Sequence, residues 1–100
     1  MTADGAVELT SFMLEKNKTL ADFILATQDI HVWLSKRAGF RRRHTFQDDS
    51  GRIYDLVFWD KKVQGVKAME KLMVVFPDAS VHSMINQRTV NWCVTPVFVS

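Results

Sequence analysis

The chain has 100 residues, of which 47% are hydrophobic and 24% are charged, with a formal net charge of +2. This length fits one domain and leaves no room for a second core, and the composition excludes a disordered chain. The small basic excess does not indicate a nucleic-acid-binding protein by itself. The single cysteine, Cys93, excludes an internal disulfide and a cysteine-based metal cluster. Because no signal peptide and no apolar run of bilayer-spanning length is found, we expect a cytoplasmic protein.

The first forty residues predict a strand followed by a helix. Residues 6–15 roughly alternate in polarity and contain no Pro or Gly, which is typical of a strand. Thr19 is suited to cap a helix that runs from Leu20 to about Arg37, because the apolar residues of this segment form one stripe. Gly39 is typical of the turn that ends such a helix.

A hairpin is predicted next, and its second strand is apolar on both faces. Residues 40–48 and 52–60 are two strands separated by a short Asp-Ser-Gly turn. Side chains alternate between the two faces of a strand. One face of the second strand carries Tyr54, Leu56 and Phe58, and the other carries Ile53, Asp55, Val57 and Trp59. Both faces must therefore be covered, and one of them includes a carboxylate.

The remaining residues predict a second helix and a last strand. Asp60 is a candidate N-cap for this helix, and Pro77 ends it. A short helical turn within residues 78–87 leads to a strand over residues 89–99. Pro96 lies in this strand and indicates an edge position, because proline cannot donate a hydrogen bond to a neighbouring strand.

The predicted order is β-α-β-β-α-β, an α+β fold of the ferredoxin-like type with a four-stranded antiparallel sheet. We expect residues 1–100 to form this single domain. Two helices can cover only one face of such a sheet, so the other face would leave a large apolar patch exposed on a monomer. We therefore expect a homodimer in which a second sheet covers it, a dimeric α+β barrel.

Residues 38–70 also carry a family resemblance. They combine a Gly-Phe pair that enters the second strand, a short acidic turn, and a third strand that ends in Trp59 before a polar cap and a helix. This pattern resembles the antibiotic biosynthesis monooxygenase group of the dimeric α+β barrel superfamily. The resemblance implies the same dimeric fold, in a group that includes cofactor-independent oxygenases of polycyclic phenols and haem-degrading oxygenases.

The resemblance favours the cofactor-independent branch. Haem-degrading members use an Asn on the first strand, a Trp within the second helix and a His after that helix. In this sequence only the histidine has a counterpart, His82. We therefore expect no cofactor.

Three polar residues are candidates for catalysis. Asp55 is a carboxylate in an apolar strand, and two interpretations remain open: an ion pair with Arg41 or Arg43 across the hairpin, or a cavity base with a raised pKa. His44 and His82 are acid–base candidates, because imidazole titrates near neutral pH. The histidines lack the spacing of metal ligands, so no metal site is predicted.

Aromatic residues are candidates for the walls of an apolar pocket. Tyr54, Trp59 and Trp33 are the predicted ligand-binding aromatics, and Asn91 is a predicted hydrogen-bond donor. The same aromatic residues would equally fill a core. The leading hypothesis is a small-molecule-binding protein that acts as a cofactor-independent monooxygenase on a hydrophobic or aromatic compound. The alternative is a non-catalytic ligand-binding or stress-related dimer.

The only charge cluster is the run Arg41 to Arg43, preceded by Lys36 and Arg37. On a strand these arginines alternate between faces, so they do not form one phosphate-binding stripe. Charged residues on an edge strand discourage unwanted strand pairing. We therefore favour edge protection or dimer contacts over nucleic-acid binding.

Overall fold

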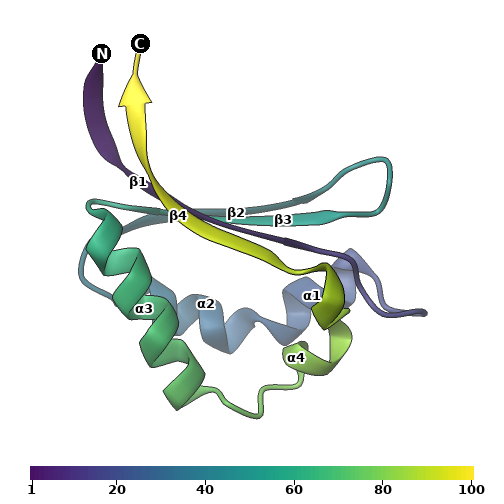
Figure 1. Ribbon diagram of the computed structural model, residues 1–100. Coiled ribbons are helices and arrows are strands. Elements are labelled where there is room, and N and C mark those ends of the chain that lie inside the picture. The colour runs from purple at the N-terminus through teal and green to yellow at the C-terminus, as the bar shows by residue number, and fades with distance from the viewer.

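The structure is a computed structural model that describes residues 1–100 and contains one four-stranded antiparallel sheet (Figure 1). The elements are, in chain order, β1 (Thr2–Phe12), α1 (Leu20–Ala26), α2 (Gln28–Ser35), β2 (Phe40–Gln47), β3 (Ile53–Trp59), α3 (Lys62–Val75), α4 (Val81–Met84), the 3-10 helix η1 (Gln87–Thr89) and β4 (Asn91–Val99). The strand order is β2-β3-β1-β4, which leaves β2 and β4 at the edges. This arrangement confirms the predicted ferredoxin-like fold.

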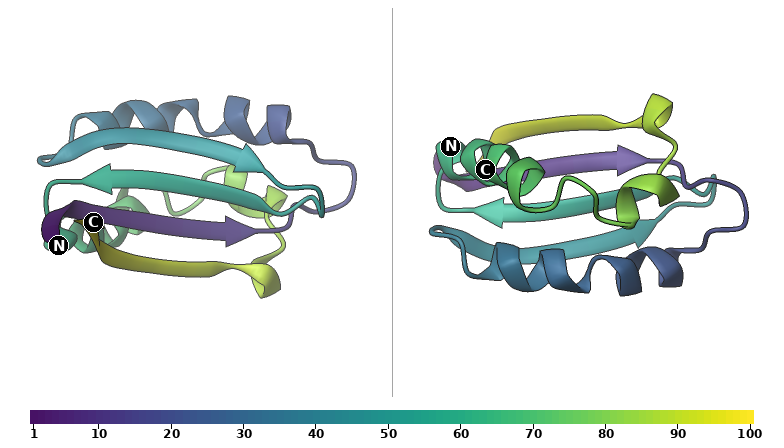
Figure 2. Two further views of the ribbon diagram at one scale, coloured as in Figure 1. Left: turned by 90° about the horizontal axis from the view of Figure 1, so that it is seen from above. Right: turned by 90° about the horizontal axis from the view of Figure 1, so that it is seen from below.

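All the helices lie on one face of the sheet, which we call the helix face, and the opposite face is bare (Figures 1 and 2). The helix face holds the core, in which the largest fully buried side chains are Trp59, Phe12 and Ile53. The bare face, which we call the open face, has no helix of this chain packed on it. No helix is long and apolar enough to cross a membrane.

One apolar face of β3 belongs to the helix face of the sheet, and the other belongs to the open face. Ile53 and Trp59 are 0% exposed and point toward the helices, and Asp55 shares their face. Tyr54 and Phe58 alternate with them on the open face and are only half-buried. The helices of this chain therefore account for one face of β3 and leave the other face without a cover.

The predicted helix from Leu20 to Arg37 is instead two helices, which meet at Thr27. The Thr27 hydroxyl donates to the carbonyl oxygens of Phe23 at 3.0 Å and Ile24 at 3.1 Å. A threonine side chain that bonds the preceding turn competes with regular helix geometry. The prediction missed this break, although the apolar stripe skips a turn between Ile24 and Ile30.

The predicted first strand, residues 6–15, is shifted: β1 begins at Thr2 and ends at Phe12. It begins earlier because Thr2 pairs with Val99 of β4. It ends earlier because the backbone N–H of Met13 donates to the Thr89 hydroxyl at 2.8 Å instead of to a neighbouring strand.

Asp60 is not the N-cap of α3, which is Lys61. The Asp60 carboxylate instead accepts a hydrogen bond from Arg41 Nε at 2.7 Å. Gln64 Oε1 accepts the backbone N–H of Lys61 at 2.9 Å, so a side chain from the first turn satisfies the helix start. The helix ends at Val75, and Pro77 follows two residues later, at the end that the sequence predicted.

The strand β4 is an edge strand, as Pro96 indicated. Pro96 pairs with Ala6, and the register of β1 and β4 shifts between Ala3 and Ala6. Beyond this shift the two chain ends curve away from the helices together (Figure 1). We call this paired segment, Thr2–Ala3 with Phe98–Val99, the terminal ribbon.

Candidate functional site

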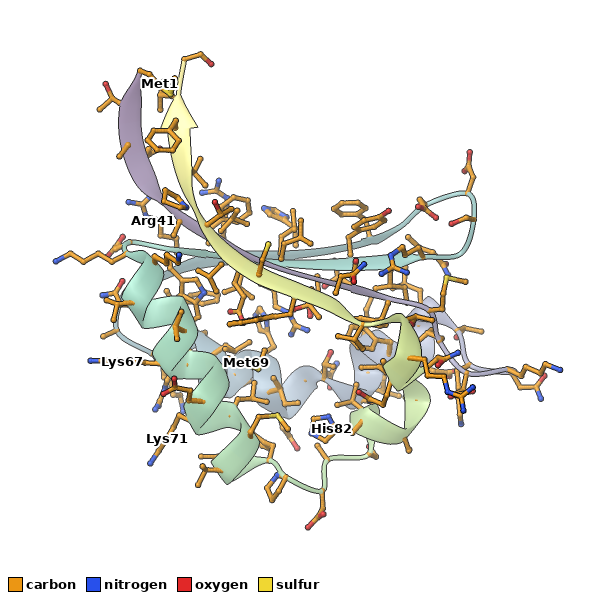
Figure 3. All side chains as sticks on the ribbon, in the orientation of Figure 1. Met1, Arg41, Lys67, Met69, Lys71 and His82 are labelled. Carbon is orange, nitrogen blue, oxygen red and sulfur yellow. The ribbon has the colours of Figure 1, made fainter.

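A cavity of about 200 Å³ lies between the helix face of the sheet and the helices. Eleven of its 18 lining residues are hydrophobic. The polar or charged lining residues are Glu8, Thr10, Thr27, Arg43, Asp55, His82 and Gln87. Figure 3 shows two lining residues from different helices, Met69 of α3 and His82 of α4, on the helix side of the sheet. An apolar space with a few polar groups is the usual composition of a small-molecule site.

A buried ion pair forms part of the sheet wall of this cavity. Arg43 Nε donates to Asp55 Oδ1 at 2.8 Å, and Arg43 Nη2 donates to Asp55 Oδ2 at 2.7 Å. The two side chains are only 6% and 15% exposed. Thr45 is directly opposite Asp55 in the register, and Arg43 lies two residues along on the same face of β2. The ion-pair interpretation of Asp55 is therefore correct, with Arg43 as the partner.

A second carboxylate, Glu8, lies in the centre of β1 and lines the same cavity. The residue is 4% exposed. Its Oε1 accepts the indole N–H of Trp59 at 3.1 Å, and its Oε2 accepts the indole N–H of Trp92 at 2.8 Å. Burial raises the pKa of the Glu8 carboxyl above its ordinary value, and the hydrogen bonds from the two indoles oppose this rise.

His82 is the imidazole of the cavity. Its Nε2 lies 2.8 Å from the carbonyl oxygen of Phe76. A carbonyl oxygen can only accept, so this contact assigns the proton to Nε2 and leaves Nδ1 of the neutral ring as an acceptor. Gln87 Nε2 donates to the His82 carbonyl oxygen at 2.9 Å and fixes the backbone of this turn.

The other predicted site residues lie outside the cavity lining. His44 is on the open face, with its ring edge-to-face against Phe58 at 6.1 Å between centroids. Tyr54 is also on the open face, and its hydroxyl donates to Asp48 Oδ2 at 3.0 Å. Asn91 is exposed on the open face of β4, opposite Ser11.

The two remaining predicted aromatics pack within the helix layer and its contact with the sheet. Trp33 of α2 meets Phe76 edge-to-face at 6.0 Å, and the Arg37 guanidinium lies 4.4 Å from the Trp33 ring centroid. Trp59 is fully buried and acts on the site indirectly, through its hydrogen bond to Glu8.

A β-bulge in β2 decides which face of the sheet His44 occupies. The sequence places His44 on the same face as Phe40, but the register shifts between Phe40 and Arg42. Phe40 therefore packs against Trp59 on the helix face, with ring centroids 5.9 Å apart, while His44 points to the open face.

The three consecutive arginines have three different surroundings. Arg41 bonds the carboxylates of Asp4 at 3.1 Å and Asp60 at 2.7 Å. Arg42 lies 4.1 Å from the Phe58 ring centroid on the open face. The third arginine belongs to the buried pair in the cavity wall. They do not form a continuous basic surface.

Sequence reasoning missed Glu8, although a signal was present. Glu8 alternates with Ala6, Thr10 and Phe12 on one strand face, so a carboxylate stands among residues that point into the core. Asp55 shows the same pattern on β3. What the sequence could not supply was the pair of indole donors, which come from two different neighbouring strands.

The cavity thus combines a carboxylate, an imidazole and a guanidinium–carboxylate pair around an apolar space. Such a set can bind a ligand hydroxyl or carbonyl, accept a proton and compensate a negative charge. No group of three or more His, Cys, Asp or Glu side chains is placed to hold a metal ion.

Comparison with known proteins identifies the fold. The sequence matches no protein-family model and no curated protein. The structure is similar to SnoaB, a cofactor-independent oxygenase from Streptomyces nogalater, with a TM-score of 0.75 and 11% identity over 98% of this chain and 97% of that chain. It is similar to the monooxygenase from the gene ActVA-Orf6 of Streptomyces coelicolor in complex with nanaomycin D, with a TM-score of 0.72 and 14% identity over 97% and 90% of the two chains.

A third similar structure is Rv0793 from Mycobacterium tuberculosis, with a TM-score of 0.72 and 10% identity over 97% of this chain and 98% of that chain. These identities are low, so the comparisons establish architecture and leave the activity to be argued from the site. The chain has the ferredoxin-like α+β fold of the antibiotic biosynthesis monooxygenase-like structures.

Proposed function

We propose that this chain is a cofactor-independent monooxygenase that acts on a small, mainly apolar aromatic compound. The observation that carries the proposal is the apolar cavity of about 200 Å³, into which Glu8, His82 and the Arg43–Asp55 pair bring polar groups. Its fold neighbours SnoaB and the ActVA-Orf6 protein are an oxygenase and a monooxygenase, which supports the same chemistry here.

The size of the cavity limits the substrate. Its volume of about 200 Å³ exceeds the roughly 150 Å³ of an apolar cavity that admits benzene. It is smaller than the roughly 300–1,000 Å³ of pockets for drug-sized ligands. The cavity therefore suits a compound of one or two rings.

The polar groups suit a reaction that begins by removing a proton. An oxygenase that uses no cofactor must convert its substrate to an electron-rich anion, such as a phenolate or an enolate, that can itself reduce O₂. Acceptors in the cavity can take the proton, and Nδ1 of His82 is one of them. The positive charge of Arg43 in a buried setting stabilises the anion.

We also propose that two copies pair through their open faces. This face carries half-buried apolar side chains from three strands, and its members include Val7, Leu9, Leu56, Phe58 and Val97. An apolar surface of this kind is unusual on a monomer, and a C₂ pair of identical sheets would cover it.

A second candidate function is ligand binding without turnover. It is favoured by the engagement of both carboxylates in the cavity. Asp55 uses its two oxygens to bind Arg43, and Glu8 uses its two oxygens to bind indoles. If these bonds serve only to hold the sheet together, His82 is left as the only acid–base group of the cavity lining that is free to act.

The experiment is a screen of one- and two-ring phenols and hydroxyquinones against chelator-treated protein. Binding is measured by calorimetry, O₂ uptake by an electrode, and product by mass spectrometry under ¹⁸O₂. The proposal expects O₂ uptake and a product that gains one ¹⁸O atom. Binding without O₂ uptake would favour the second candidate, and no binding by any compound would contradict both.

Two neighbouring substitutions on α3 link the result to the cavity. Met73 lines the cavity and is 51% exposed, so Met73→Trp should obstruct it without disturbing the core. Val74 is the next residue, is 71% exposed and does not line this cavity, so Val74→Trp is the matched control. Binding and turnover should be lost only in Met73→Trp.

A further inference from the structure

We propose that Glu8 is the proton acceptor of the cavity. Its carboxylate selects ligands that carry an acidic hydroxyl, namely phenols or enols, and takes up the proton of that hydroxyl. The inference rests on the proposed function, because it requires that the cavity hold the ligand. It adds the residue that recognises the ligand and the chemical class that this residue demands.

The geometry leaves Glu8 able to accept further hydrogen bonds. Each of its oxygens accepts one indole N–H, from Trp59 at 3.1 Å and from Trp92 at 2.8 Å. A carboxylate oxygen has about two acceptor positions, so each oxygen keeps one. Indole nitrogens can only donate, so the two tryptophans hold the carboxylate in place without supplying a positive charge.

Glu8 differs in this respect from the other carboxylate of the cavity. Asp55 is bonded at both oxygens by the Arg43 guanidinium in a two-hydrogen-bond ion pair. Glu8 makes no salt bridge, and its residue exposure is 4%. A buried carboxylate without a bonded cation gains by accepting a proton.

The charged groups around Glu8 can be stated for each element that lines the cavity. Arg43 comes from β2, Asp55 from β3 and His82 from α4. The lining residues of α1, α2 and α3 are uncharged. Asp55 raises the pKa of Glu8 and Arg43 lowers it, but both effects are smaller than that of burial, which raises it.

The proton transfer is balanced within the site. The O–H bond of the ligand breaks, its proton forms an O–H bond on Glu8, and the electron pair stays on the ligand oxygen. One buried negative charge is exchanged for another, and Arg43 remains a cation of the cavity lining. At low pH Glu8 is already protonated and cannot take part, so hydroxyl-dependent binding should weaken as the pH falls.

The test uses 4-nitrophenol, whose ionised form absorbs visible light, and 4-nitroanisole, its methyl ether without the proton. Glu8→Gln alone would place an amide NH₂ against an indole N–H. The test variant is therefore Glu8→Gln combined with Trp92→Phe, and Trp92→Phe alone is the matched control. Trp92 is 41% exposed, so its replacement should leave the fold intact.

The proposal expects the Trp92→Phe protein to bind 4-nitrophenol at least about tenfold more tightly than 4-nitroanisole, since a hydrogen bond to a charged group contributes that much. The bound 4-nitrophenol should show the visible absorbance of its anion, and the preference should decline at low pH. The double variant should bind both compounds alike and leave 4-nitrophenol neutral.

Two results would overturn it. If both compounds bind equally well in the presence of Glu8, or if the double variant keeps the preference and the anion absorbance, Glu8 is not the acceptor, while the cavity remains a binding site. If neither compound binds to any of the proteins, both this inference and the proposed cavity site are wrong.

Discussion

Removing Asp55 should destabilise this protein far more than removing an ordinary surface charge. In the variant Asp55→Leu, the Arg43 guanidinium keeps its charge at a position where its side chain is only 6% exposed. It also loses two hydrogen bonds of 2.7 and 2.8 Å. A buried charge left without its partner costs about 3–5 kcal/mol, whereas an exposed ion pair contributes about 0–1 kcal/mol.

The double variant Arg43→Met/Asp55→Leu isolates the cause. It removes the unpaired charge and replaces the pair with apolar side chains of similar volume. Such replacements are often neutral or stabilising, so we expect the double variant to recover most of the stability that Asp55→Leu loses. The coupling between the two positions should therefore amount to about 2 kcal/mol or more, because the residues are in direct contact.

Urea unfolding followed by tryptophan fluorescence measures these differences. For a chain of 100 residues with a denaturant slope of about 1–2 kcal/mol/M, the expected loss moves the midpoint by roughly 1.5 M or more. The reasoning is refuted if Asp55→Leu loses less than about 1 kcal/mol. It is equally refuted if the double variant is as unstable as the single one, because the cost would then come from cavity shape and not from charge.

Three further predictions follow from individual residues. Because burial raises the pKa of Glu8 in the folded chain, the native state binds more protons than the unfolded state at pH values between the ordinary and the raised pKa. The wild type should therefore lose stability relative to Glu8→Gln as the pH rises through this window. Urea midpoints of the two proteins that change in parallel with pH would contradict it. Gly39→Ala should cost more than Gly51→Ala in thermal unfolding. Both glycines have positive φ, of 84° and 89°, but only at Gly39 would the new Cβ displace the Gln64 side chain, whose Oε1 accepts the Lys61 N–H at the start of α3. Leu56→Lys on the open face should give a folded monomer by light scattering where the wild type gives a dimer, and a wild type that is already monomeric would refute the pairing of open faces.

The succession of strands and helices along the chain could be predicted because the sequence signals for them are local. The hairpin of residues 40–48 and 52–60 rests on alternating side chains and on a short turn, and both appear in adjacent residues. The break at Thr27 is also local, but it depends on the Thr27 hydroxyl donating to a backbone carbonyl instead of to solvent. The spacing of apolar residues does not reveal that hydrogen bond, so the sequence predicts one helix where two are present.

The candidate site could be predicted only where its members are neighbours across one hairpin. The partner of Asp55 could be limited to two arginines, because β2 and β3 are joined by a short turn and their register follows from it. The side chains around Glu8 come from β1, β3 and β4, and their meeting depends on pairing between distant segments. The position of His44 depends on one bulged residue, which moves a whole side chain to the other face of the sheet.

The terminal ribbon has a mechanical consequence. Thr2 pairs with Val99 at its free end, so tension applied between the two chain ends would load one backbone hydrogen bond at a time and unzip β4 from β1. Strands pulled in this geometry separate at lower force than strands that are sheared lengthwise. Peeling would proceed along β4 to Trp92 and carry its indole away from Glu8, while Trp59 on β3 stayed in place. A pull on the termini would thus change the chemistry of the cavity once β4 has peeled away, while β1, β2 and β3 are still paired.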